Sequence, residues 1–270
     1  MNRIDRMFAA RRRESRAAMI FFLTAGCPDL ESTEQAIDAL AEAGVDLIEL
    51  GIPFSDPIAD GPTIQRASQV ALERGTTVKA ILDLVRRVRA RHPDLALLLF
   101  TAYNPVFHYG EAAFVAAAAE AGADGLLIPD LPPEEAGELR RLASERELCV
   151  VFLVAPTSSS ARARAICEAS TGFVYYISLR GVTGARAELP ADIEERLREL
   201  KTLTGKPVAV GFGISGPDQA RALVPLCDGI IVGSALVRLI GEQPRPTLRE
   251  DVRRFAGEMC AALAEAATAR

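Results

Sequence analysis

The sequence predicts an α/β fold of the (β/α)8, or TIM-barrel, class with an extra N-terminal helix. Short apolar runs alternate with amphipathic segments along most of the 270 residues, and the alternation repeats about eight times. Eight such units fit a closed barrel better than an open doubly wound sheet. No linker rich in Gly, Pro or Ser divides the chain, so we expect a single domain over residues 1–270.

The chain opens with an arginine-rich segment that contains Arg11, Arg12, Arg13 and Arg16. These residues alternate with helix formers, which predicts the solvated face of an N-terminal helix. Nucleic-acid binding is the less favoured interpretation, because the net charge of the chain is −5.

The predicted strands are apolar runs that are mostly too continuous for half-exposed strands. Such continuity is typical of a parallel sheet that is buried on both faces. The runs are Met19–Thr24, Leu47–Leu50, Ala96–Thr101, Gly125–Ile128, Cys149–Val154, Phe173–Ile177, Val208–Val210 and Gly229–Val232.

The segments between these runs have the amphipathic pattern of helices. Several begin at a plausible cap, as in Ser32–Gln35 and Gly216–Asp218, and glycines such as Gly44 and Gly122 predict left-handed helix ends. The expected helices are Ser32–Ala43, Val78–Arg91, Glu111–Ala121, Glu134–Arg146, Ser160–Ala169, Ile193–Leu203 and Pro217–Leu223, with a closing helix between Pro244 and Arg270.

Composition narrows the class of protein. The apolar fraction of 49% and the charged fraction of 25% are typical of a globular chain. The five cysteines form no Cys-x-x-Cys pair, which favours reduced, buried thiols, and the two isolated histidines do not predict a metal site. The start of the sequence shows no signal-peptide hydrophobic region, and apolar runs such as Leu95–Phe100 are far short of a membrane span. We therefore expect a cytoplasmic protein with neither membrane nor nucleic-acid partners.

The segment from Asp46 to Thr63 carries the strongest functional signal. Glu49 lies inside an apolar strand, where burial raises the pKa of a carboxyl and suits it to proton transfer. Asp60 follows in a Pro- and Gly-stiffened loop, from which a carboxylate can accept a hydrogen bond from a ligand N–H. The alternatives are a salt-bridged core acid for Glu49 and a solvated or capping residue for Asp60. Asp56 is better explained by turn chemistry, and Asp130 as mainly structural.

Glycine-rich segments follow the last three predicted strands: Gly181–Gly184, Gly211–Ser215 and Val232–Ala235. Glycine lets a backbone N–H approach an oxyanion closely, and barrels commonly hold a phosphate at this position. Each segment alone is better explained by a tight turn. Together they predict a site for a phosphate monoester. No Walker or dinucleotide-binding motif is present, so a nucleotide is not expected.

Several of these segments resemble one family in the same order along the chain. Glu49–Gln65 is similar to the signature of the tryptophan synthase alpha subunit, and Pro129–Pro133, Ser178–Gly184 and Gly211–Ser215 match the same family. The resemblance extends from Phe22 to Ser234 and implies a TIM-barrel lyase. It implies retro-aldol cleavage of indole-3-glycerol phosphate to indole and glyceraldehyde 3-phosphate.

The resemblance also implies roles for individual residues. Glu49 would be the main acid–base group, Asp60 would bind the indole N–H, and Tyr175 would help to hold Glu49. The substrate-binding positions are Phe22, Ile64, Phe100, Leu127, Leu153, Tyr175, Thr183 and Phe212. The phosphate-binding positions are Gly184, Gly213, Gly233 and Ser234.

A partner is implied as well. In the family, a pyridoxal-phosphate-dependent beta subunit receives the indole, so no cofactor is expected in this chain. The loop after the sixth strand, from Val182 to Pro190, would be a lid, and Arg180 at its hinge departs from the small or polar residue expected there. The loop with Asp56 and Asp60, together with Tyr103–Pro105, would contact the beta subunit. Three alternatives stay open: a standalone lyase that releases indole, a catalytically idle regulatory subunit, and an isomerase of related sugar phosphates.

Overall fold

The computed structural model describes residues 1–58, 60–177, 192–211 and 213–268. All pairings between its strands are parallel, in the order β5-β4-β3-β2-β1-β9-β8-β7-β6. The strands are β1 Ala18–Thr24, β2 Leu47–Gly51, β3 Ala96–Phe100, β4 Gly125–Leu127, β5 Cys149–Val151, β6 Leu153–Val154, β7 Val174–Ile177, β8 Val208–Gly211 and β9 Gly229–Val232.

The two ends of this strand order meet at Phe152, which alone separates β5 from β6. β5 pairs with β4, whereas β6 pairs with β7, so the predicted strand Cys149–Val154 is interrupted where it leaves one neighbour and joins the other. The Tyr175 N–H donates to the Phe152 carbonyl at 3.2 Å across this break. Counted through Phe152, eight strand positions close the sheet, which confirms the predicted (β/α)8 barrel.

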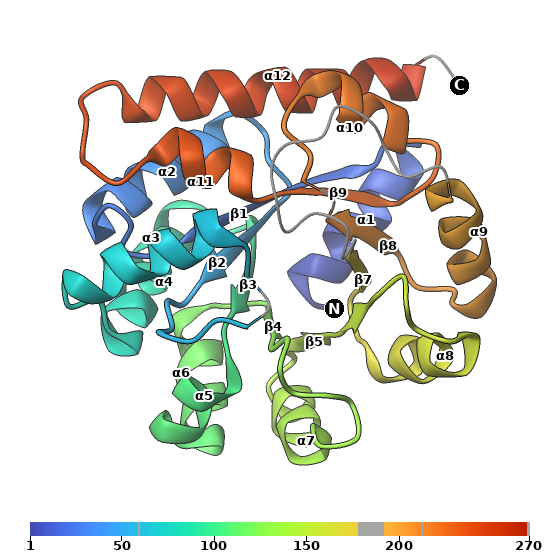
Figure 1. The fold of residues 1–270 in the computed structure, drawn as a ribbon, viewed down its shortest axis with the longest axis horizontal. Coiled ribbons are helices and arrows are strands. Elements are labelled where there is room, and N and C mark those ends of the chain that lie inside the picture. Colours follow the sequence, from blue (N-terminus) through green and yellow to red (C-terminus); the bar gives the residue numbers. More distant parts are fainter. Residues whose placement is uncertain (59, 178–191, 212, 269–270) are drawn as a thin grey trace.

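Helices surround the barrel (Figure 1). They are α1 Arg3–Arg13, α2 Leu30–Glu42, α3 Pro62–Glu73, α4 Val78–Arg91, α5 Tyr103–Tyr109, α6 Glu111–Ala121, α7 Gly137–Glu145, α8 Ser160–Ala169, α9 Ile193–Leu203, α10 Pro217–Leu223, α11 Ser234–Ile240 and α12 Leu248–Thr268. The predicted left-handed ends are confirmed, with φ of 82° at Gly44 and 94° at Gly122. The predicted cap at Ser32 is wrong, because Asp29 caps α2 by accepting the Ser32 N–H.

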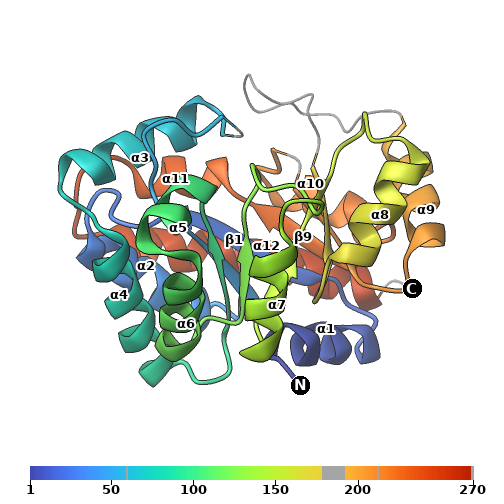
Figure 2. The ribbon, with the colours of Figure 1, turned by 90° about the horizontal axis from the view of Figure 1, so that it is seen from below.

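Two apolar layers hold these elements together. A large cluster lies between the sheet and the outer helices, and a second fills the barrel. Helix α1 closes the N-terminal end of the barrel (Figure 2), where Ile4 and Phe8 are buried and the Phe8 and Phe173 rings lie 5.4 Å apart. Arg12 and Arg13 are exposed as predicted. Arg16 is not, because it forms an ion pair with Asp46 at 3.1 Å.

Three aspartates fix the strand register at the same end of the barrel. Each precedes a strand, and its carboxylate accepts a backbone N–H of the neighbouring strand. Asp46 accepts from Met19 at 2.8 Å, Asp124 from Leu97 at 2.8 Å, and Asp228 from Val208 at 2.9 Å. A one-residue slip would turn every side chain to the other face, so these bonds help to decide which residues point into the barrel.

No helix in the described parts of the chain is long and apolar enough to cross a membrane. All five cysteines are buried as reduced thiols, as predicted.

Candidate functional site

Glu49 points into the barrel from the middle of β2. Leu47 on the same strand belongs to the interior cluster, whereas Ile48 and Leu50 pack against the outer helices. In register, Glu49 lies between Phe22 of β1 and Leu98 of β3. The alternation of side chains along a strand therefore directs this acid into the barrel core.

The carboxyl of Glu49 is fully buried, with 0% of its surface exposed. Neither of its oxygens has a hydrogen-bond partner among the described residues. Burial raises its pKa to about 8, since the charged form loses its hydration without gaining a partner. The alternative of a core acid held in a salt bridge is thus wrong for the described part of the chain.

The Phe22 ring occupies the space that a side chain at Gly51, two residues after Glu49, would fill. A Cβ at position 51 would lie 2.6 Å from Cζ of Phe22. The Phe22 ring meets Phe100 edge to face, with centroids 5.4 Å apart and planes at 78°. These two aromatic rings form an apolar wall above the level of Glu49.

The loop after β2 carries Asp60 back toward this wall. The Asp60 N–H donates to the Pro57 carbonyl at 3.1 Å, and Gln65 Nε2 donates to the Asp60 carbonyl at 2.9 Å. The side chain is partly buried, and desolvation raises its pKa to about 6. Asp60 precedes α3 by two residues, so the first turn of that helix orients it.

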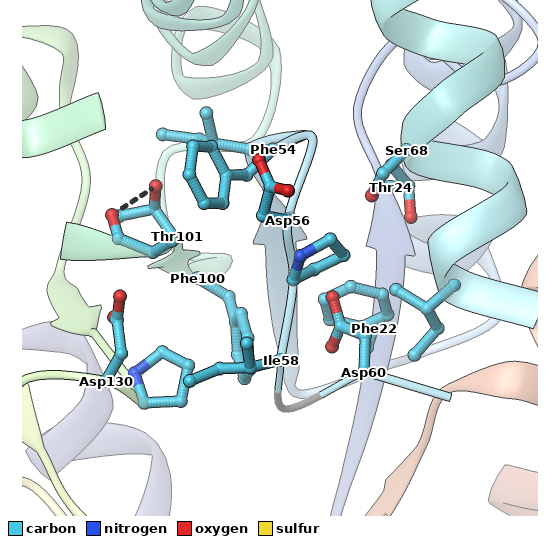
Figure 3. Close-up of a pocket in the computed structure, with 16 residues that line it drawn as sticks. Phe22, Thr24, Phe54, Asp56, Ile58, Asp60, Ser68, Phe100, Thr101 and Asp130 are labelled. Atoms are coloured by element: carbon cyan, nitrogen blue, oxygen red, sulfur yellow. Dashed lines mark hydrogen bonds between the residues drawn. The ribbon is translucent and has the colours of Figure 1, made fainter. Parts of the chain in front are cut away.

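A pocket opens at the C-terminal ends of β1–β4 (Figure 3). It brings together the predicted site residues Phe22, Asp60, Ile64 and Phe100. Glu49 does not line it. Glu49 lies two residues below Gly51 on the same strand, roughly 7 Å deeper in the barrel. The other lining residues are Thr24, Gly51, Ile52, Phe54, Asp56, Pro57, Ile58, Ser68, Thr101, Ala102, Pro129 and Asp130.

Tyr175 enters the barrel from β7, in register with Leu153 and Ala209. Its pKa is raised well above the usual value by burial, then by the negative charge of Glu49 and, less strongly, that of Asp60. The phenol therefore lies within electrostatic range of both carboxylates. Leu127 of β4 is buried in the interior cluster, and Leu153 of β6 packs against it.

One described member of the predicted phosphate site, Gly233, lies beside this wall. Gly213 has φ of 55°, a conformation that favours glycine. A Cβ at Gly233 would lie 3.6 Å from Cβ of Phe22, and Ser234 begins α11. Arg180, Thr183, Gly184 and Phe212 lie outside the described residues.

The two remaining loop acids behave largely as predicted. Asp56 accepts the Ser55 hydroxyl at 2.5 Å, as expected of a turn residue. Asp130 accepts the Tyr103 N–H at 2.8 Å and thereby caps α5, whose own N-cap residue Ala102 provides no side-chain acceptor. Both also line the pocket.

A model of the family described as tryptophan synthase alpha chain matches residues 8–267. The chain belongs to the tryptophan synthase alpha chain family. It is a lyase that cleaves indole-3-glycerol phosphate in tryptophan biosynthesis. This confirms the family that the sequence motifs indicated and excludes the sugar-phosphate isomerase.

Similar proteins of the tryptophan synthase alpha chain family cover nearly the whole sequence. The alpha chain of Caldanaerobacter subterraneus is 50% identical over 242 residues, which are 90% of this chain and 92% of that protein. The solved tryptophan synthase of Mycobacterium tuberculosis superposes with a TM-score of 0.89 at 39% identity, covering 97% and 98% of the two chains. The tryptophan synthase complex of Pyrococcus furiosus gives 0.84 at 39% identity, covering 91% and 98%.

Sequence reasoning missed several residues around the pocket of this tryptophan synthase alpha chain. Thr24 ends β1, and Ser68 lines the pocket from α3, a helix that is not among the predicted ones. A polar residue at the end of an apolar run was a usable signal for Thr24. Ser68 has no comparable signal, because its place depends on how α3 packs on β1.

Proposed function

We propose that Glu49 is the acid–base group for cleavage of indole-3-glycerol phosphate. One observation carries this proposal: a fully buried carboxyl without a described partner lies on the strand that leads into the Asp60 loop. With a pKa raised to about 8, Glu49 holds protonated and ionised forms in comparable amounts at mildly alkaline pH. A group in this condition both donates and accepts a proton.

The reaction needs two proton movements. A proton is added to the ring carbon that bears the glycerol chain, which leaves a positive charge on the indolenine nitrogen. The carbon–carbon bond then breaks, and its electron pair returns to the ring to restore indole. The hydroxyl on the departing carbon loses its proton and becomes the aldehyde of glyceraldehyde 3-phosphate. Glu49 is suited to serve both steps because its carboxyl lies below the wall formed by Phe22 and Phe100.

Asp60 is proposed to bind the indole N–H and to stabilise the positive indolenine. An ionised carboxylate in a partly desolvated position interacts more strongly with developing positive charge than it would in water. Its place on the pocket wall beside Phe22 and Ile64 supports this role. The indole ring would contact Phe22, Phe100, Leu127 and Leu153, while Tyr175 holds Glu49.

The phosphate is proposed to bind the glycine-rich segments after β7, β8 and β9. Gly213, Gly233 and Ser234 are the described members, and Gly184 would complete the site, while Thr183 and Phe212 would contact the rest of the substrate. The contact between Gly233 and Phe22 supports it, because it places this segment next to the proposed indole position.

We further infer that the chain works as a single cytoplasmic domain with a pyridoxal-phosphate-dependent beta subunit. No cofactor is proposed for this chain itself. Two exposed large apolar side chains support a docking surface: Ile58, which lines the pocket, is 86% exposed, and Phe107 of α5 is 70% exposed. The Pyrococcus furiosus neighbour is described as a tryptophan synthase complex.

An indole-release assay on the purified chain, with and without a tryptophan synthase beta chain, tests these proposals. Coupled function predicts slow release by the chain alone and faster turnover with the partner. Equal rates in both conditions would instead indicate a standalone lyase. An absence of indole in both conditions, from a folded chain, would contradict the assignment of Glu49 and favour the idle subunit.

A further inference from the structure

Three buried oxygens on β1 and β2 lack hydrogen-bond partners among the described residues: Oε1 and Oε2 of Glu49 and Oγ1 of Thr24. The other buried side-chain atoms in this condition are nitrogens of Arg11 and Arg16, at the opposite end of the barrel. Glu49 has a proposed role in the reaction. The hydroxyl of Thr24 is buried without a described partner and has no role in the proposed function.

Packing alone does not account for the hydroxyl of Thr24. The residue is only 3% exposed, and it ends a strand whose other members are all apolar. Valine has nearly the same shape and would leave no unpaired polar atom there. Thr24 also lines the pocket, as does Ser68 of α3 (Figure 3). A buried hydroxyl on a pocket wall is suited to a polar ligand atom.

The position of β1 indicates which polar atom of the ligand the Thr24 hydroxyl would bind. β1 lies between β2, which carries Glu49, and β9, which leads to Gly233. Thr24 is in register with Gly51, one inward-facing position above the pair Phe22 and Glu49. A ligand whose carbon chain connects an atom near Glu49 to a phosphate near Gly233 must therefore cross the end of β1.

We propose that the Thr24 hydroxyl, in the pocket that Ser68 also lines, binds a hydroxyl of the substrate's glycerol chain. The inference rests on the proposed function, which already gives the ring N–H to Asp60 and the phosphate to the glycine-rich segments. Glu49 is proposed to act on the hydroxyl of the departing carbon. The hydroxyl of the next carbon is therefore the one that Thr24 binds. Thr24 is thus a specificity-determining residue for a polyol chain.

The test compares two ligands that differ only in these hydroxyls. Indole-3-glycerol phosphate is the substrate, and 3-(indol-3-yl)propyl phosphate keeps the ring and phosphate but lacks both hydroxyls. For Thr24→Val we expect kcat/KM with the substrate to fall about five- to thirtyfold, chiefly through KM. The inhibition constant of the propyl analogue should stay within about twofold of wild type. Thr24→Ser, which keeps the hydroxyl, should recover most of the loss.

Equal weakening of both ligands by Thr24→Val would overturn the proposal, because it would indicate a purely structural effect. Unchanged kcat/KM would overturn it as well. Failure of the proposed function is recognised separately by Glu49→Gln, since retained turnover in that variant contradicts the role of Glu49 whatever Thr24→Val shows.

Discussion

Gly211 of β8 leaves the space that the hydroxyl of Tyr175 on β7 occupies. A Cβ at position 211 would lie 2.4 Å from Oη of Tyr175 and 2.7 Å from Cε1. The ring is held in the barrel interior, so it cannot move aside without disturbing its neighbours. The position of the phenol, whose pKa is raised by burial and then by the charge of Glu49, thus depends on the absence of a side chain one strand away.

Gly211→Ala should therefore destabilise the protein by about 1–3 kcal/mol and lower indole release, because the Tyr175 ring is forced out of place. Denaturant unfolding and initial rates measure the two effects. Tyr175→Phe is the matched control, since it removes the oxygen that meets the new methyl group first. In the double variant the losses of stability should be less than additive. Simple additivity would show that the two residues are not coupled through this contact.

The burial of Glu49 makes the stability of the protein depend on pH. Its folded-state pKa of about 8 lies above the ordinary value of 4.5, so the folded state favours the protonated form. The stabilisation due to protonation is complete below about pH 4.5 and is lost as the pH rises toward 8. Glu49→Gln imitates the protonated form. The variant should exceed wild type by about 3–5 kcal/mol in unfolding free energy at pH 8.5, and by less than about 1 kcal/mol at pH 5.

Denaturant titrations of both proteins at the two pH values check this prediction, and all other titrating groups cancel in the difference. A difference that is the same at pH 5 and pH 8.5 would mean that Glu49 is ionised in the folded protein at both. The same variant should lose nearly all indole release while it still binds the propyl phosphate analogue. Retained turnover would remove Glu49 from the chemistry.

The barrel was predictable because its signals are local and repeated. Continuous apolar runs gave the strands, and glycines such as Gly122 gave the helix ends. Helix α5 was missed because its cap comes from Asp130, which lies 27 positions further along the chain. The break at Phe152 was missed because an apolar run carries no record of the neighbour with which each half pairs. Both features depend on contacts distant in sequence.

The candidate site likewise has features that the sequence predicts and features that depend on contacts distant in sequence. Glu49 was predictable, since an acid inside an apolar strand is conspicuous. That it lies beneath the pocket rather than on its wall was not predictable, because depth is decided by the register of three strands and by the Phe22 ring over Gly51. The position of Thr24 on the pocket wall also depends on strand register, because β1 pairs Thr24 with Gly51. The sequence specifies which side chains are present, and the closure of the barrel decides which of them meet.

Asp60→Asn should lower the rate of indole release about a hundredfold or more while the fold stays intact. The amide keeps the shape of the carboxylate but carries no charge to stabilise the indolenine. Burial raises the pKa of Asp60 to about 6, so the wild-type rate should fall as the pH drops below about 6 and the carboxylate is protonated. The Asn variant should lack that acid limb. A wild-type rate in the variant, or an unchanged acid limb, would contradict the role.

The predicted phosphate site is tested most directly at Gly213. No atom of the described residues lies within 4 Å of a Cβ built at this position, so these residues leave room for a side chain, but φ of 55° strains most residues other than glycine. Gly213→Asp adds both strain and a negative charge, whereas Gly213→Asn adds a side chain of the same shape that tolerates this conformation and carries no charge. The pair therefore separates electrostatic repulsion from steric effects.

If the phosphate binds next to Gly213, the Asp variant should raise KM for indole-3-glycerol phosphate at least tenfold more than the Asn variant does. Added salt should reduce the difference, because it screens the repulsion between two negative charges near the surface. Indole without a phosphate chain should bind the two variants equally in a competition assay. Similar KM values for the Asp and Asn variants would place the phosphate away from Gly213.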